Sequence, residues 1–67
     1  MKEYETIDSL AKELGVCRRT VQNRVREMSP HIGKEYPEEA MLKDGRVKRI
    51  RVADYFHFCN HREEMMA

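Results

Sequence analysis

Apolar residues near the start of the chain recur at the spacing of one helix face. They occupy positions i, i+3, i+4 and i+7, as Ile7, Leu10, Ala11 and Leu14. Thr6 is a favourable N-cap before this stripe, Asp8 suits the first helical turn, and Gly15 can end the helix. The pattern predicts an amphipathic helix that begins after Thr6 and ends at Gly15.

A second helical stripe follows within residues 18–28. Its apolar positions are i, i+4 and i+7, occupied by Val21, Val25 and Met28. Ser29-Pro30 blocks its continuation, because proline lacks the amide hydrogen that a helix interior needs. The sequence therefore predicts two helices joined by a three-residue turn, Gly15-Val16-Cys17.

The segment after these helices reads as a connector followed by a hairpin. Residues 29–39 contain both prolines and Gly33, as connectors do, with Ile32 and Tyr36 as candidate anchors on the core. The hairpin is expected over residues 40–52.

The predicted hairpin turns at Asp44-Gly45. This dipeptide favours a type I′ turn, in which both central residues need positive φ. A two-residue turn at this point places Leu42 opposite Val47. Val47 and Ile50 are three residues apart, whereas side chains on one strand face are two apart, so we expect a bulge or a frayed second strand.

Apolar residues return to helical spacing at the end of the chain, as Val52, Tyr55, Phe56 and Cys59. This stripe predicts a third helix over residues 53–64 that frays at its end. Its aromatic residues are expected to be core or contact residues rather than platforms for nucleobases. Phe58 lies off the stripe, and for this residue exposure stays open as an alternative.

Length and composition limit the fold class. A chain of 67 residues holds one small core, so we expect a single domain over residues 1–67 and no deep enzyme cleft. Charged residues make up 37%, but 40% of the chain is hydrophobic, which argues against disorder. No apolar run suits a membrane span or a signal peptide, and we expect a cytoplasmic protein. The expected fold is mainly α with a small β-hairpin.

Positive charge is concentrated in two blocks, although the whole chain carries a net charge of only +1. Residues 17–26 contain four arginines and no acidic residue, for a net charge of +4. Residues 43–51 contain five basic residues and one aspartate, also for +4. The remaining segments are net acidic. Two elements of one small fold can therefore present a single basic face.

The first two predicted helices have the spacing of a helix-turn-helix. Two helices that cross through a short turn need a small residue at their contact, a residue that tolerates left-handed φ, and an aliphatic residue on the second helix. Ala11, Gly15 and Val21 meet these needs in IDSLAKELGVCRRTVQNRVREM. The segment resembles the bacterial helix-turn-helix, and LGVCRRTVQNRV is similar to the Leu-Gly-Val-Ser-x-x-Thr-Val run of many regulators. Cys17 replaces the serine N-cap of that family, so capping of the second helix is expected to be weaker.

The order of hairpin and short helix in AMLKDGRVKRIRVADYFHF resembles small excisionase-like members of the MerR-type winged helix-turn-helix superfamily. The resemblance implies a helix-turn-helix over residues 6–28, a connector over 29–39, a wing over 40–52 and a C-terminal helix over 53–64. It also implies that basic residues of the wing lie against the DNA backbone or the adjacent minor groove. These residues are Arg46, Lys48, Arg49 and Arg51.

The second helix carries side chains that can read bases. Opposite its apolar stripe lie Arg18, Arg19, Gln22, Asn23 and Arg26. Arginine can bond guanine O6 and N7 in a bidentate pair, and Asn or Gln can bond adenine N6 and N7. Thr20 and Arg24 lie to the side and suit phosphates.

Other constellations give weaker signals. His57, Cys59 and His61 invite a metal interpretation, but a tetrahedral site needs further ligands that the chain does not obviously supply. A disulfide between Cys17 and Cys59 is not expected in the cytoplasm. The sequence offers no nucleophile–base pair and no phosphate-binding glycine loop, so we expect no cofactor and no enzymatic activity.

These observations lead to two hypotheses about function. The first is a double-stranded DNA-binding protein, acting as an excisionase-like recombination directionality factor or as a small transcriptional regulator of a mobile element. Its expected protein partner is a recombinase (integrase) or RNA polymerase, with no membrane and no small-molecule substrate. The alternative is a protein-interaction module in which the helix-turn-helix is only a scaffold. That module would bind its partner through the acidic ends, Phe58 and Met65-Met66.

Overall fold

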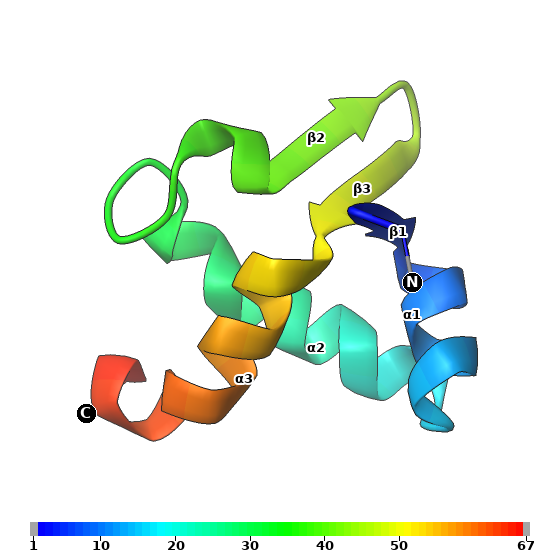
Figure 1. Ribbon diagram of the computed structural model, residues 1–67, viewed down its shortest axis with the longest axis horizontal. Coiled ribbons are helices and arrows are strands. Elements are labelled where there is room, and N and C mark those ends of the chain that lie inside the picture. The colour runs from blue at the N-terminus through cyan, green and yellow to red at the C-terminus, as the bar shows by residue number, and fades with distance from the viewer. Residues whose placement is uncertain (1, 67) are drawn as a thin grey trace.

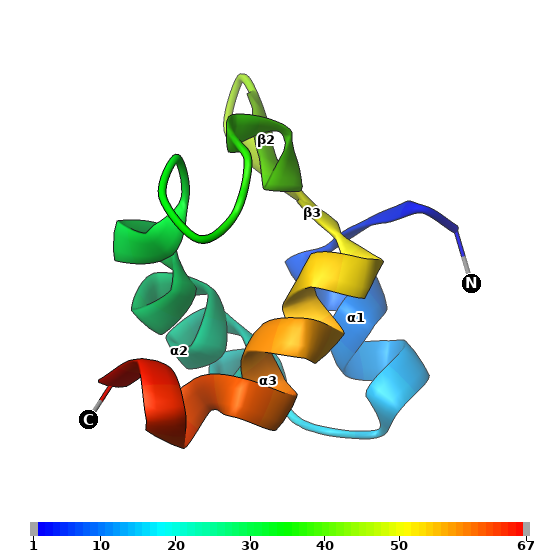
Figure 2. The same ribbon diagram turned by 60° about the vertical axis from the view of Figure 1, so that its left-hand side comes forward.

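The computed structural model describes residues 2–66 of the chain. The elements follow in the order β1 (Tyr4–Thr6), α1 (Ile7–Leu14), α2 (Arg18–Met28), η1 (Ser29–His31), η2 (Glu38–Ala40), β2 (Met41–Asp44), β3 (Val47–Arg51) and α3 (Val52–Met66). The strands form an antiparallel sheet in the order β1-β3-β2, from which the hairpin β2–β3 rises above the helices (Figures 1 and 2). The expected mainly α fold with a small hairpin is confirmed.

The first two helices begin and end where the sequence predicts. The Thr6 side chain accepts a hydrogen bond from the amide of Ser9 at 3.2 Å, which caps α1. Gly15 ends α1 in the left-handed region at φ 67°, a conformation that costs glycine little because it has no Cβ. Cys17 precedes α2 without a side-chain capping bond to the helix backbone. The turn between α1 and α2 is therefore the predicted one, with the expected weaker cap on α2.

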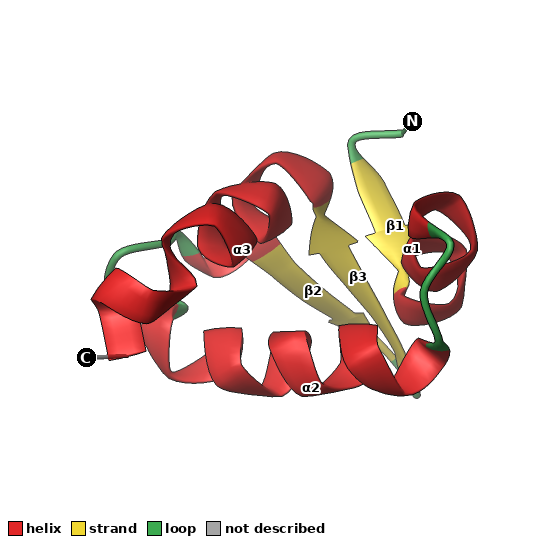
Figure 3. Cartoon of the chain, turned by 90° about the horizontal axis from the view of Figure 1, so that it is seen from below, coloured by secondary structure: helices red, strands yellow, loops and turns green. Residues whose placement is uncertain are grey.

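One cluster of buried residues joins α1, α2, β3 and α3. It contains Leu10, Ala11, Val21, Val25, Ile50, Val52 and Tyr55. Val21 is completely buried, as the stripe on α2 predicts, whereas Leu14 at the end of α1 is partly exposed. In Figure 3, which is seen from below, β2 and β3 lie behind α2 and α3. The sheet and the two helices therefore share this core.

Phe58 is a core residue, and the alternative that it is exposed, on which the protein-interaction hypothesis relies, is wrong. Its side chain is completely buried in a second cluster with Met28, Tyr36 and Ala40. The connector between α2 and β2 folds over α3 and brings Tyr36 and Ala40 onto it, so the buried face of α3 is wider than the apolar stripe suggests. Tyr36 is thus an anchor of the connector, as predicted. The helix is also longer than expected, because it begins at Val52 and extends to Met66.

The hairpin turn lies one residue later in the chain than predicted, which shifts the pairing of the two strands by two residues. Asp44 pairs with Val47, so the turn consists of Gly45 and Arg46, and Leu42 lies opposite Arg49. Gly45 has positive φ, but Asp44 does not. A type I′ turn at Asp44-Gly45 needs positive φ at both residues and is therefore excluded.

The pairing of β2 with β3 is continuous from Met41↔Ile50 to Asp44↔Val47, without the expected bulge. The register places Met41 and Ile50 on the inner face and leaves Leu42 and Val47 outside, 41% and 44% exposed. The observed register places Ile50 directly opposite Met41, so the two apolar side chains of the inner face meet where the hairpin joins the core.

Strand β1 is an element that the sequence pattern does not reveal. Its three residues pair with β3 from Tyr4↔Arg51 to Thr6↔Arg49. The Tyr4 hydroxyl also donates a hydrogen bond to the carbonyl of Glu39 at 2.8 Å. The strand makes β3 the central strand of the sheet and joins the hairpin directly to the start of α1.

Candidate nucleic-acid interface

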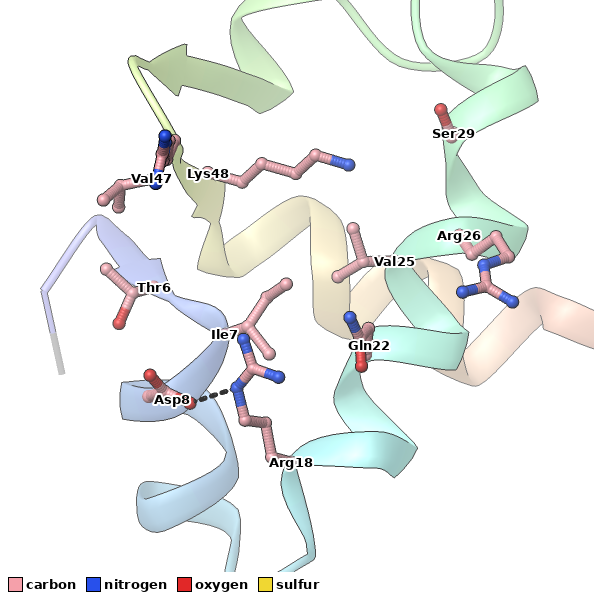
Figure 4. A pocket seen from close by; sticks show the side chains of 11 residues that line it. Thr6, Ile7, Asp8, Arg18, Gln22, Val25, Arg26, Ser29, Val47 and Lys48 are labelled. Carbon is pink, nitrogen blue, oxygen red and sulfur yellow. Dashed lines mark hydrogen bonds and ion pairs between the residues drawn. The ribbon is translucent and has the colours of Figure 1, made fainter.

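An open groove of about 370 Å³ lies between the hairpin, the start of α1 and one face of α2 (Figure 4). Its lining includes the basic side chains Arg18, Arg26, Arg46 and Lys48. The remaining lining residues are Thr6, Ile7, Asp8, Gln22, Val25, Ser29 and Val47. Four cations against one carboxylate give the groove a positive charge that the net charge of the chain does not reveal.

Helix α2 brings three of the predicted residues to the groove. Arg18, Gln22 and Arg26 are four residues apart, so successive turns of the helix place them on one side. Arg19 and Asn23 are exposed on α2 but do not line the groove. The five residues predicted to read bases are therefore divided between a row along the groove and a pair beside it.

Arg24 lies against α3 rather than in the groove. Its guanidinium is 3.4 Å from the carboxylate of Glu27, which also accepts two hydrogen bonds from Arg62 at 2.5 and 2.8 Å. The bonds from Arg62 hold the pKa of Glu27 below its usual value. Arg24 thus belongs to an ion-pair cluster that joins α2 to α3.

Thr20 is half-buried in the first turn of α2, with its hydroxyl 3.2 Å from the sulfur of Cys17. This hydrogen bond lowers the pKa of the exposed Cys17 thiol. The hydroxyl of Thr20 therefore has a partner within the protein at the start of α2.

The hairpin divides its basic residues between two faces. Arg46 and Lys48 line the groove, and the Lys48 side chain extends toward α2 in Figure 4. Because side chains alternate along a strand and Ile50 points inward, Arg49 lies on the opposite face of the sheet. Arg51 is half-buried and pairs with Asp54 at 2.5 Å, which raises the pKa of Arg51 and joins β3 to α3. Two of the four predicted wing residues thus line the groove.

The groove also contains Asp8, which the sequence analysis assigned only to the first turn of α1. Its Oδ1 atom accepts a hydrogen bond from Nε of Arg18 at 2.5 Å. The two residues are ten positions apart and meet because the turn at Gly15 folds α2 back beside α1. No local pattern signals such a contact. Ser29, noted in the sequence only for ending the helix with Pro30, likewise lines the groove.

The histidines of α3 are placed by contacts within the protein. The hydroxyl of Tyr36 is 2.8 Å from Nδ1 of His57, and the rings of His57 and His61 are 4.4 Å apart. Within residues 2–66, no three His, Cys, Asp or Glu side chains are grouped so that they could hold a metal ion. Cys59 is half-buried, which raises the pKa of its thiol, and neither it nor Cys17 is in a disulfide.

Comparisons with family models, with curated proteins and with solved structures find no match to this chain. In the part of the chain that the structure describes, no helix is both long and apolar enough to cross a membrane.

Proposed function

We propose that the protein is a double-stranded DNA-binding protein of the winged helix-turn-helix class. In this proposal α2 enters the major groove, and the hairpin β2–β3 is the wing that lies on the neighbouring backbone or minor groove. The observation that carries the proposal is the groove itself. It gathers Arg18 and Arg26 from one basic block of the sequence and Arg46 and Lys48 from the other.

Duplex DNA explains this arrangement better than a small anionic ligand does. The groove is open rather than enclosed, and α2 also carries the exposed side chains of Arg19 and Asn23, which lie outside it. A helix of this diameter fits the major groove, where Gln22 and Asn23 can hydrogen-bond to base edges. The cations beside them suit the phosphates that border the groove.

The cellular role follows from the resemblance to excisionase-like proteins of the MerR-type superfamily. In that role the protein is a recombination directionality factor or a small transcriptional regulator of a mobile element and acts in the cytoplasm. It bends DNA or recruits a recombinase (integrase) or RNA polymerase, and it performs no catalysis itself.

The alternative of a protein-interaction module loses its main support in the structure. Phe58 is buried, and Met65 is half-buried with its sulfur 3.6 Å from the hydroxyl of Tyr36. The side chain of Met66 lies outside the described residues. The described part of the third helix therefore offers no exposed apolar face built from these residues.

A salt titration of duplex binding tests the proposal. We expect the affinity to fall with salt, because cations that contact phosphates displace condensed counterions. Replacing both Arg46 and Lys48 by alanine should make the logarithmic slope shallower by roughly 0.9 for each phosphate that the variant no longer neutralises. The matched control replaces the exposed Lys12 and Lys34, which lie outside the groove.

The control variant loses the same charge and should keep the wild-type slope. Equal slopes for the two double variants would remove the groove from the interface. If the unchanged protein binds no duplex at low salt, the proposed function is wrong.

A further inference from the structure

An exposed ion pair joins α1 to α2 along the wall of the groove. Nε of Arg18 donates to Oδ1 of Asp8 at 2.5 Å, and the side chains are 59% and 75% exposed. A pair so exposed contributes little to folding stability, because water screens it and two long side chains must be held in one geometry. Its consequence lies instead in the position that it gives to the arginine.

Asp8 uses one edge of the guanidinium and leaves the other available. Arginine has five N–H donors in a planar fork, and the bond to Asp8 occupies the Nε–H. Figure 4 shows the two terminal nitrogens of Arg18 turned away from Asp8, toward the groove beside Ile7 and Gln22. These nitrogens carry the parallel N–H groups that make bidentate bonds.

We propose that Arg18 reads a guanine in the major groove and that Asp8 is the positioning residue that sets its specificity. The inference rests on the proposed function, because it needs α2 to face base edges. Guanine offers O6 and N7 as two adjacent acceptors, which match the free edge of Arg18. Adenine offers an amino donor in place of O6, so an arginine held in this orientation disfavours it.

The Asp8 carboxylate gives the pair effects on DNA binding that an arginine without a partner lacks. Asp8 repels phosphates, so it weakens attraction to every duplex regardless of sequence. In exchange, it restricts the rotamers of Arg18, and a side chain already held in place loses less freedom when it contacts a base. Asp8 therefore favours discrimination between sequences over total affinity.

The other exposed arginines of α2 lack this arrangement. Among residues 2–66, no carboxylate forms an ion pair with Arg19 or Arg26. Such arginines can follow phosphate oxygens over a range of positions, whereas the bond to Asp8 favours one orientation of Arg18. The inference thus assigns a different role to Arg18 than to its neighbours.

The test begins with enrichment of target duplexes from a random pool by the unchanged protein. Each position of the enriched site is then varied, and affinities are measured for the wild type and for Asp8→Asn, Arg18→Ala and Arg18→Lys. The control is Glu13→Gln, which removes one negative charge from α1 at an exposed position outside the groove. Thermal melts by circular dichroism verify that every variant folds.

We expect Asp8→Asn and Glu13→Gln to bind scrambled duplex somewhat more tightly than the wild type, because each loses a negative charge. Only Asp8→Asn should lose preference for guanine at one position, by about tenfold. Both variants of Arg18 should lose the same preference, and Arg18→Lys should keep most of its binding to scrambled duplex. The double variant of Asp8 and Arg18 should show the same base preference as Arg18→Ala, because Asp8 sets that preference through Arg18.

Two results would overturn the inference and leave the proposed function intact. One is that Asp8→Asn prefers guanine as strongly as the control Glu13→Gln does at every position of the site. The other is an unchanged base preference in Arg18→Ala. Absence of any duplex binding by the wild type would instead overturn the proposed function, and this inference with it.

Discussion

At the scale of single residues, Val21 determines whether the first two helices can pack. Its side chain is completely buried in the cluster that contains Leu10 and Ala11 of α1. No charged side chain of the described residues is buried, in this cluster or elsewhere. A charge at this position would have no partner.

We therefore expect Val21→Asp to unfold the protein. Burial of an unpaired carboxylate costs several kcal/mol, which is comparable with the whole stability of a domain of this size. Helical circular dichroism at 25 °C should be lost. Val16→Asp is the matched control, because Val16 is 41% exposed, and it should melt cooperatively near the wild-type midpoint. A cooperative melt of Val21→Asp at that temperature would show that Val21 is not internal.

At the scale of elements, Glu27 is the main polar link between α2 and α3. Its carboxylate accepts two hydrogen bonds from Arg62, and these hold its pKa below the ordinary value of 4.5. A carboxyl group with a lowered folded-state pKa adds stability at pH values above its unfolded pKa. That contribution is lost as the pH falls through the folded-state value.

This linkage predicts a difference between the wild type and Glu27→Gln that depends on pH. At neutral pH the wild type should have the higher melting temperature, because the variant cannot form the ion pair with Arg62. The difference should shrink as the pH is lowered below about 4.5, where Glu27 of the wild type becomes protonated. Other carboxylates titrate in both proteins and cancel in the comparison. A difference independent of pH would contradict the role of the ion pair.

The helices and the place of the hairpin were predictable from sequence, whereas the register of the hairpin and strand β1 were not, because the two sets depend on information of different range. Local spacing and caps suffice for α1 and α2, from Thr6 to the stop at Ser29-Pro30. The hairpin register depends on which side chain the core buries, and this is Ile50, whose contacts lie on other elements. Strand β1 is too short to show a pattern and exists only because β3 pairs with it.

The candidate interface likewise has features that depend on local sequence and features that depend on contacts between elements. The two basic blocks are visible in the sequence, and the structure brings Arg18 and Arg26 opposite Arg46 and Lys48. The sequence could not show that Arg51 is used by Asp54 of α3, or that Arg18 meets Asp8. Each of these pairs forms where two elements happen to meet in three dimensions, so its residues carry no signal in isolation.

At the scale of the whole molecule, the fold connects the groove rigidly to the core. Strand β1 pairs with β3 and leads into α1, and β3 leads directly into α3. The hairpin is therefore attached to two helices of the core. The distance between α2 and the hairpin is therefore set by the core rather than by a loose loop. A fixed spacing suits recognition of a regular duplex, whose grooves and backbone also repeat at fixed distances.

Recognition of bases by α2 is tested by replacing its uncharged polar residues one at a time. Gln22→Ala and Asn23→Ala should each cost about 1–3 kcal/mol of binding free energy on the natural site, if their amides bond to bases. Neither carries charge, so binding to a scrambled duplex should change little. Arg19→Ala should weaken binding to both duplexes, because removal of its charge reduces attraction to any phosphate backbone.

The two duplexes must be compared at one salt concentration, because the electrostatic part of binding changes with ionic strength. Since Gln22 faces the groove and Asn23 lies beside it, the pair also maps how far base contacts extend around α2. A loss for Gln22 alone would confine them to the groove side. Equal losses on both duplexes would mean that α2 docks on the backbone without reading bases, and no loss in any of the three variants would favour the protein-interaction alternative.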